Sequence, residues 1–266
     1  MELYAQSWEP NENPKAVVCL VHGLGEHSRR YAHVGKAFAT AGFVLAGFDL
    51  RGHGKSGGPR GHTPSYGALM DDTNNFVDLE TSHYPQLPCF LYGHSLGGNL
   101  VINFALRRKV ELLGVVATGP LLKLAFQPPT SKVTLGKIMN NILPGFSQAS
   151  GLETSALSRD SEIVSAYEND PLVHNKISAR LFVNAFETGL WALDHAEDIT
   201  LPLLLMHGGA DRLTSSEASL QFAESAGDKV TLRIWDGLYH EIHNEPEQGE
   251  VLAFMVDWMN SQLKKK

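Results

Sequence analysis

Short apolar runs alternate with helical patterns along the first part of the chain. The runs are almost continuously apolar, which is typical of strands buried on both faces in a parallel sheet. The strand-like runs are residues 15–21, 43–48, 88–92 and 115–118, and the helical patterns are residues 31–41, 66–82 and 96–108. This pattern predicts an α/β fold with a mostly parallel central sheet and helices on both faces.

The same alternation returns after residue 200, with strand-like runs at residues 203–207 and 230–235 and helical patterns at residues 215–226 and 248–263. Between the two regions, residues 120–190 interrupt it, because prolines break this stretch into short helical pieces. We therefore expect a core of residues 1–119 and 191–266. Residues 120–190 are expected to form a helical cap over the sheet edge where α/β proteins bind ligands.

Apolar side chains recur at helical spacing within the predicted cap and form one stripe. The stripe consists of Leu135, Ile138, Met139, Ile142, Leu143 and Phe146. It is expected to pack on the core, to line an apolar substrate tunnel, or to do both. Residues 121–190 carry six Lys or Arg and six Asp or Glu, so the predicted cap has no net charge. Its lysines suggest a transient contact with a lipid surface.

Composition and charge exclude several classes of protein. The chain of 266 residues has a formal net charge of −7, whereas a nucleic-acid-binding domain needs a basic face. The 2 cysteines lie in apolar runs and cannot form a disulfide framework. No apolar stretch reaches the roughly 18 residues of a membrane span, and the N-terminal pattern is not that of a signal peptide. We expect a cytoplasmic protein without an obligate protein partner.

The segment GHSLG at residues 93–97 matches the G-x-S-x-G pattern between a strand-like run and a helical pattern. On a sharp strand-to-helix turn, flanking glycines relieve crowding and leave the serine hydroxyl exposed above the sheet. The start of the following helix also favours negative charge. The pattern therefore predicts Ser95 as a nucleophile. The alternative is a glycine-rich turn with an inert serine.

A serine nucleophile needs a base, and the base needs an acid that orients it. In this type of sheet both follow the serine, on loops after late strands. Asp211 and His240 follow the last two strand-like runs, so we expect Asp211 as the acid and His240 as the base. His243 is the rival for the base. His207, at the end of a strand-like run, is expected to pack.

Acyl transfer also needs two backbone N–H donors for the developing oxyanion. We expect one from Leu96, directly after Ser95, and one from Leu24, in the turn after residues 15–21. His22, in the same turn, is expected to shape the turn and not to transfer protons in the reaction.

Three other motifs are incomplete. Residues 23–28 resemble a dinucleotide fingerprint but have Ser28 in place of the third glycine. Residues 54–56 read GKS, but Asp49 stands where a phosphate-binding loop needs a glycine. A zinc helix would need a histidine where Asn244 stands. The sequence therefore predicts no cofactor and no metal.

Five motifs, in order and spacing, resemble the monoacylglycerol lipase and lysophospholipase-like branch of the α/β hydrolases. They are HGLGEHSRRY at 22–31, DLRGHGKS at 49–56, GHSLGG at 93–98, GADR at 209–212 and YHEIH at 239–243. The resemblance runs from about residue 3 to residue 263. It implies the α/β-hydrolase fold, a triad of Ser95, Asp211 and His240, and an oxyanion hole at Leu24 and Leu96. The family usually has one more strand before residues 3–8, so about seven strands are expected without that edge strand.

The resemblance also implies a polar set that meets a glycerol head group beside the oxyanion hole. By motif position these residues are Glu26, Arg30, His94, Tyr167 and His243. It further implies a serine hydrolase that cleaves carboxylic esters through an acyl-serine, with monoacylglycerol as the expected substrate. The alternatives are a lysophospholipase, a broad carboxylesterase and, more distantly, a non-catalytic binding protein. An aminopeptidase is disfavoured, because residues 121–152 hold no acidic side chain for a peptide amine.

Overall fold

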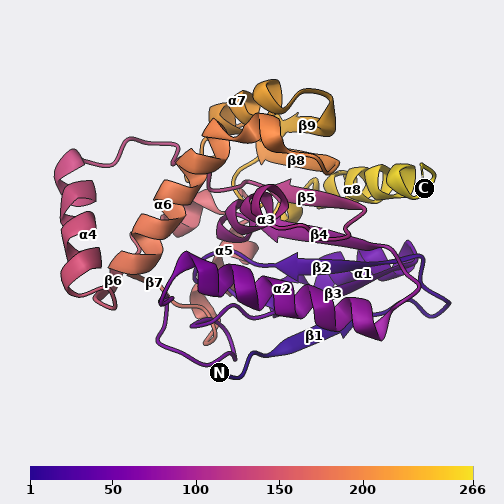
Figure 1. Cartoon of the computed structure of the whole chain (residues 1–266), viewed down its shortest axis with the longest axis horizontal. Helices are drawn as coiled ribbons and strands as arrows, with labels where there is room; N and C mark the ends of the chain where they lie inside the picture. The colour runs from indigo at the N-terminus through magenta and orange to yellow at the C-terminus, as the bar shows by residue number, and fades with distance from the viewer. Residues whose placement is uncertain (266) are drawn as a thin grey trace.

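A seven-stranded sheet forms the centre of the protein (Figure 1). The computed structural model describes residues 1–265, apart from the side chain of Lys132. The strands of the sheet are β1 (Ala5–Trp8), β2 (Ala16–Val21), β3 (Phe43–Phe48), β4 (Cys89–His94), β5 (Gly114–Thr118), β8 (Leu203–Gly208) and β9 (Val230–Trp235). Their order is β1-β3-β2-β4-β5-β8-β9. Only β1, at one edge, runs antiparallel to its neighbour, which confirms the mostly parallel sheet predicted from the sequence.

Five long helices cover the two faces of this sheet, as the alternating pattern predicts. One face is covered by α1 (Ala32–Thr40) and α8 (Gln248–Leu263), and the other by α2 (Tyr66–His83), α3 (Leu96–Arg107) and α7 (Ser216–Ala226). Short 3-10 helices connect these elements: η1 (Ser28–Tyr31), η2 (Thr154–Ala156), η3 (Ala196–Asp198), η4 (Gly227–Lys229) and η5 (Ile242–Asn244).

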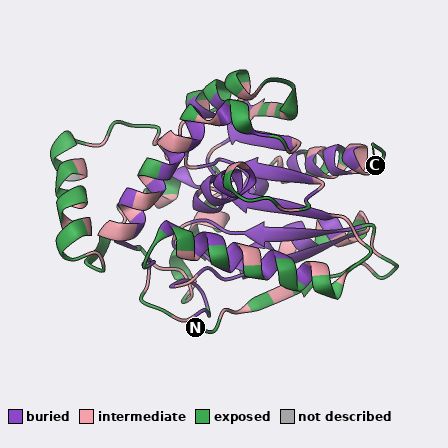
Figure 2. Cartoon of the chain, in the orientation of Figure 1, coloured by how far each residue is buried: buried purple, intermediate pink, exposed green. Residues whose placement is uncertain are grey.

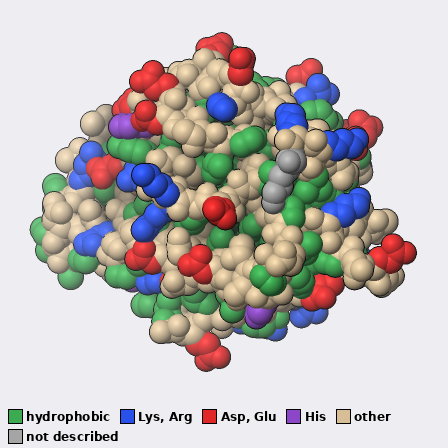
Figure 3. Space-filling view, turned by 45° about the vertical axis from the view of Figure 1, so that its right-hand side comes forward, with side chains coloured by type: hydrophobic (Ala, Val, Ile, Leu, Met, Phe, Trp, Pro, Cys, Tyr) green, Lys and Arg blue, Asp and Glu red, His purple; other side chains and the backbone are tan. Residues whose placement is uncertain are grey.

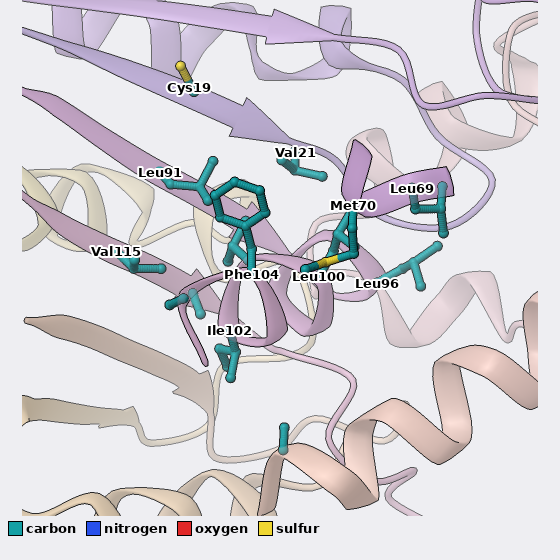
Figure 4. Close-up of a cluster of buried hydrophobic side chains, with 14 of the residues drawn as sticks. Cys19, Val21, Leu69, Met70, Leu91, Leu96, Leu100, Ile102, Phe104 and Val115 are labelled. Carbon is teal, nitrogen blue, oxygen red and sulfur yellow. The ribbon is translucent and has the colours of Figure 1, made fainter. Parts of the chain in front are cut away.

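Burial on both faces explains why the strands are continuously apolar. In β2 every residue is buried (Figure 2). Successive side chains of this strand join opposite cores. Figure 4 shows the core on the α2 and α3 side, where Val21 and Leu91 of the sheet lie near Met70 of α2 and Phe104 of α3. Two cores of this kind hold the strands rigidly, so loops at the strand ends have a fixed base.

Residues 120–190 contribute helices and a small second sheet on one side of the main sheet (Figure 1). Their elements are α4 (Thr130–Ile142), β6 (Ser147–Ala149), α5 (Ser161–Asn169), β7 (Lys176–Ser178) and most of α6 (Ala179–Asp194). The antiparallel pair of β6 and β7 was not expected from the sequence. The expected boundary at residue 190 falls inside α6, and this helix also packs against α3 of the core.

The expected role of the apolar stripe on residues 135–146 is wrong in both of its forms. Its members Leu135, Ile138, Ile142, Leu143 and Phe146 are between 48% and 68% exposed (Figure 2). They therefore neither pack on the core nor line the pocket at Ser95. The reason is that α4 packs through another side, where the small Gly136 lies against the side chains of α6.

The surface carries charges of both signs. Figure 3 shows Lys and Arg interspersed with Asp and Glu over the visible face, without a wide patch of one sign. Over residues 1–265, none of the helices combines the length and hydropathy that a bilayer span requires.

Candidate active site

Ser95 sits on the sharp turn between β4 and α3. Its φ of 56° makes it the one non-glycine residue with positive φ within the described part of the chain. The Ser95 N–H donates to the carbonyl of Thr118 at 3.0 Å, which ties the turn to the end of β5. Such a conformation costs about 1–3 kcal/mol and persists only where the surroundings enforce it, commonly at functional sites.

The two glycines of the G-x-S-x-G pattern are required by close backbone contacts. A Cβ on Gly97 would lie 2.0 Å from the carbonyl oxygen of Val21. A Cβ on Gly93 would lie 2.3 Å from the carbonyl oxygen of Gly97. The pattern thus allows α3 to begin directly against β2, with Ser95 at the carboxyl edge of the sheet.

Asp211 and His240 lie next to each other, on the loops after β8 and β9. The His240 Nδ1 donates to Asp211 Oδ2 at 2.7 Å, and both side chains are buried. His240 and Ser95 line the same pocket. The structure therefore brings together the three residues of the predicted triad, from loops that are far apart in the sequence.

The charges of this pair are set by burial and by each other. Burial lowers the pKa of His240, but the Asp211 carboxylate raises it more, so that the pKa lies above its usual value. Burial raises the pKa of Asp211, yet His240 and His207 together hold it well below its usual range. At neutral pH Asp211 is an anion that can only accept, so His240 carries its proton on Nδ1 and leaves Nε2 free.

Two residues around Asp211 were not assigned to the site from the sequence. His207 contacts Asp211 Oδ2 through Nε2 at 3.1 Å, so this buried histidine does more than the packing expected of it. Thr214 donates its hydroxyl to the same oxygen at 2.8 Å. The other oxygen, Oδ1, accepts the N–H of Leu213 at 2.7 Å and of Thr214 at 3.0 Å. The sequence places Thr214 in the loop directly after Asp211, which could have suggested a role in the site. It does not show that the Thr214 side chain points toward the Asp211 carboxylate.

The pocket over Ser95 combines apolar and polar walls. It is lined by Gly23, Leu24, Glu26, His94, Ser95, Leu152, Leu157, Tyr167, His240 and Glu241. Of the five residues expected to meet a head group, Glu26, His94 and Tyr167 are in this lining, whereas Arg30 and His243 lie outside it. Leu152, Leu157 and Glu241 were not anticipated.

The two expected oxyanion donors flank the serine. Leu24 lines the pocket, and Leu96 is the first residue of α3, so its N–H has no acceptor within the helix. Glu26 holds the turn before Leu24, since its Oε1 accepts the Gly23 N–H at 2.7 Å. His22 joins the same turn to the segment after β3, because its Nε2 accepts the N–H of Leu50 at 2.9 Å. This agrees with the shaping role expected of His22.

His243 lies behind the pocket as a buried, uncharged ring. It stacks on Tyr31 with ring centroids 4.8 Å apart, and neither ring nitrogen has a hydrogen-bond partner among residues 1–265. Burial lowers the pKa of His243 to about 3, although Glu241 raises it in part. His243 is therefore placed too deep to contact a ligand above Ser95 directly.

Glu26, His94 and Glu241 are the group within residues 1–265 that could offer three ligand atoms to a metal ion, all within 4.8 Å of one another. The Arg30 guanidinium already bonds both carboxylates. A positive charge thus fills the place that a cation would take, and the donor set does not fit a metal.

The α/β hydrolases are defined by a strained serine at a strand-to-helix turn, with a buried histidine and aspartate on later loops at the same carboxyl edge of a mostly parallel sheet. Residues 12–247 match the model of the family described as serine aminopeptidase, S33, and the chain belongs to this family. This membership confirms the fold and the family resemblance predicted from the sequence.

Relatives of the chain span nearly its whole length. A monoacylglycerol lipase of Mycolicibacterium smegmatis is 36% identical over 96% of this chain and 92% of that protein. An uncharacterized abhydrolase domain-containing protein of Dictyostelium discoideum is 35% identical over 98% of this chain, which covers only 28% of that longer protein. The crystal structure of Paleococcus ferrophilus monoacylglycerol lipase is 39% identical, with a TM-score of 0.90, and the match covers 98% of this chain and 100% of that one.

Proposed function

We propose that the protein is a serine ester hydrolase that cleaves monoacylglycerol into a fatty acid and glycerol. The observation that carries this proposal is the buried Asp211–His240 pair, joined at 2.7 Å, whose His240 lines the same pocket as the strained Ser95. Two of the relatives that match this chain over most of both lengths are monoacylglycerol lipases, which supports the same substrate.

In the proposed reaction the Ser95 hydroxyl attacks the ester carbonyl and its proton passes to Nε2 of His240. The N–H groups of Leu24 and Leu96 hold the oxyanion of the tetrahedral intermediate. His240 then returns the proton to the glycerol oxygen as the carbon–oxygen bond to glycerol breaks, which leaves the acyl group esterified to Ser95. Water, activated by the same imidazole, attacks the acyl carbon, and Ser95 regains its proton from His240 as the fatty acid leaves. Asp211 keeps His240 in the tautomer that this sequence of steps needs.

The polar wall of the pocket suits the free hydroxyls of a glycerol head group. The Nδ1 of His94 contacts the Thr118 carbonyl at 3.1 Å, so it donates there and leaves Nε2 as an acceptor. Burial, with His240 and His243 nearby, holds the pKa of His94 well below its usual value, so the ring is neutral. A site built to bond hydroxyls rejects a substrate that lacks them. Leu24, Leu152 and Leu157 offer the acyl chain an apolar wall.

We further propose that residues 120–190 act as a cap that contacts lipid surfaces through the stripe of α4 and the turn after it. Apolar side chains of this size are normally buried, and a contiguous exposed group marks an interaction surface. Lys137 of the same helix is also exposed, but it pairs with Glu187 of α6 at 3.3 Å, so the proposed contact rests on the apolar side chains.

The test compares initial hydrolysis rates on monoolein and triolein dispersed in the same detergent. We expect rapid cleavage of monoolein and slow cleavage of triolein, which has no free hydroxyl. Equal rates would contradict the head-group pocket, and the variant Ser95→Ala controls for contaminating activity.

Three further substrates separate the alternatives in the same assay. Faster cleavage of a lysophospholipid than of monoolein would make the protein a lysophospholipase. Equal cleavage of a simple short ester would make it a broad carboxylesterase, and turnover of none of these would make it a binding protein. An aminoacyl nitroanilide tests the activity in the family description, which we expect to be absent because residues 121–152 hold no acidic side chain.

A further inference from the structure

The side chain of Arg30 connects two parts of the site that are far apart in the sequence. From η1, its Nη1 donates to Glu26 Oε2 at 2.8 Å and to Glu241 Oε1 at 2.6 Å, and its Nη2 donates to Glu241 Oε2 at 2.7 Å. The side chains of Glu26 and Glu241 are 3% and 2% exposed, and that of Arg30 is 10% exposed. The three form a buried ion triad and not a surface pair.

One end of this triad holds the turn that supplies the first oxyanion donor. Glu26 Oε1 accepts the N–H of Gly23 at 2.7 Å and the hydroxyl of Tyr31 at 2.8 Å. Gly23 directly precedes Leu24, and a Cβ at Gly23 would lie 3.2 Å from the Cβ of Ser95. The orientation of the Glu26 carboxylate therefore fixes the peptide next to the reacting serine.

The other end holds the loop that carries the base. Glu241 directly follows His240, and its N–H donates to the Leu157 carbonyl at 2.8 Å. Glu241 Oε2 also accepts from Nδ2 of Asn244 at 2.7 Å, which closes the loop after β9 on itself. Any shift of the Glu241 side chain thus displaces the backbone that positions the imidazole.

We propose that Arg30 is a positioning residue that locks the oxyanion turn to the base loop and does not bind the head group. The inference rests on the proposed function, in which Leu24 and His240 act on one tetrahedral centre. Their relative position must then be held closely, since a displacement of about 1 Å costs about 10²-fold in rate.

The surroundings of Arg30 distinguish positioning from substrate binding. The ring of Tyr167 lies 4.7 Å from the guanidinium carbon, and Tyr167 lines the pocket whereas Arg30 does not. Burial lowers the pKa of Arg30, but Glu241 and Glu26 raise it more, so that it stands well above its usual value. A guanidinium engaged by two carboxylates and covered by a tyrosine ring has little capacity left for a glycerol hydroxyl.

Lysine cannot replace this arrangement. An ammonium group is a point charge, whereas the planar guanidinium binds Glu241 through two parallel bonds and still reaches Glu26. Arg30→Lys therefore keeps the charge and loses the connection between the two loops. Arg30→Gln loses both and leaves two carboxylates buried next to each other, which is strongly unfavourable.

The experiment measures kcat and KM of wild type, Arg30→Lys and Arg30→Gln on monoolein and on p-nitrophenyl acetate, which has no glycerol. Rates are expressed per active site titrated with a fluorophosphonate, so that unfolded protein does not count. We expect kcat of Arg30→Lys to fall about 10- to 100-fold on both substrates, with KM changed less than threefold. Arg29→Gln, an exposed neighbour, is the matched control and keeps wild-type values.

Each contrary result has a distinct meaning. A rise in KM for monoolein with unchanged turnover of p-nitrophenyl acetate would make Arg30 a head-group ligand and overturn the inference. Unchanged kcat on both substrates, with only a lower melting temperature, would reduce Arg30 to a structural role and also overturn it. If Arg30→Gln does not fold, kcat and KM of Arg30→Lys alone decide between positioning and head-group binding. Failure of wild type to cleave monoolein would overturn the substrate assignment, while p-nitrophenyl acetate still tests Arg30.

Discussion

At the scale of single residues, the Asp211 carboxylate is the most constrained group of the site. One oxygen accepts two backbone N–H groups, and the other meets His207, Thr214 and His240. These bonds favour the anion and fix its direction toward the imidazole. The acid is therefore oriented before any substrate arrives, and the tautomer of His240 follows from it.

The variant Asp211→Asn tests this arrangement. We expect kcat to fall by about 10⁴-fold, because an amide at this position favours the wrong imidazole tautomer. The pKa of His240 should also fall, since the Asp211 charge raises it in the wild type. The base must be neutral, so the acid limb of the kcat/KM profile should move to lower pH.

The kcat/KM of the residual activity of Asp211→Asn, measured from pH 4.5 to 8, gives the position of the acid limb. The exposed Asp236→Asn, on the loop after β9, is the control and should leave the profile unchanged. An unmoved limb in Asp211→Asn would show that the profile does not report His240.

At the scale of elements, the meeting of β2 with α3 gives a sharp prediction. In Gly97→Ala the new Cβ would lie 2.0 Å from the Val21 carbonyl oxygen, so strand and helix must move apart. Alanine is favoured over glycine in a helix by about 1 kcal/mol. We expect the clash to outweigh this gain and to lower the free energy of unfolding by several kcal/mol. Gly249→Ala in α8, where a Cβ meets nothing within 4 Å, is the control and should stabilise or be neutral. Urea unfolding of both variants measures this, and equal stabilities would contradict it.

The exposed stripe of α4 gives a second prediction at this scale. In the double variant with Ile138→Ser and Ile142→Ser, we expect at least tenfold weaker binding to phosphatidylcholine vesicles, since a fully buried Ile contributes about 1.5–3 kcal/mol. Turnover of soluble p-nitrophenyl acetate should not change. The control is Leu220→Ser, an apolar side chain of α7 that is 45% exposed. Equal loss of vesicle binding in both would remove any special role of α4.

Elements with a regular apolar period are predictable from the sequence, and contacts across the chain are not. Core strands such as β3 and core helices such as α8 match their predicted ranges, because burial on both faces imposes the pattern. The side of α4 that packs could not be predicted, since a small Gly136 decided it. Ser95, Asp211 and His240 followed from strand ends, and their catalytic roles stay predictions. The bond of Arg30 to Glu241 joins residues 211 positions apart and leaves no local signal.

At the scale of the whole molecule, residues 120–190 are tied by side-chain contacts to the loops that carry Asp211 and His240. Ser158 donates to the Asn244 carbonyl at 2.9 Å, and Arg159 pairs with Glu245 at 2.7 Å. On another loop, Arg212, next to Asp211, pairs with Glu153 at 2.9 Å. The segment of residues 153–159 thus supports the loops of both acid and base. Residues 120–190 cannot move as one rigid lid without disturbing the site, whereas α4 lies on the outside of α6.

Buried histidines that stay neutral make stability depend on pH, and His243 is one of them. It is fully buried between Tyr31 and His33, with His94 against its edge and Glu241 and Arg30 acting on its charge. Burial lowers its pKa to about 3 in the folded protein, against about 6.5 for an exposed histidine. Between these values the unfolded chain binds a proton that the folded protein does not. Stability is therefore retained above pH 6.5 and lost as the pH falls toward 3.

The variant His243→Phe keeps a ring against Tyr31 and removes this proton. In wild type the free energy of unfolding should fall with decreasing pH by about 1.4 kcal/mol per unit for this residue alone, and that part of the slope should vanish in the variant. Urea unfolding at pH 7, 6, 5 and 4.5 gives both slopes. His83→Phe, at an exposed position, controls for the substitution itself. A variant slope equal to that of wild type would mean that His243 is protonated in the folded protein, paired with the neighbouring Glu241 carboxylate.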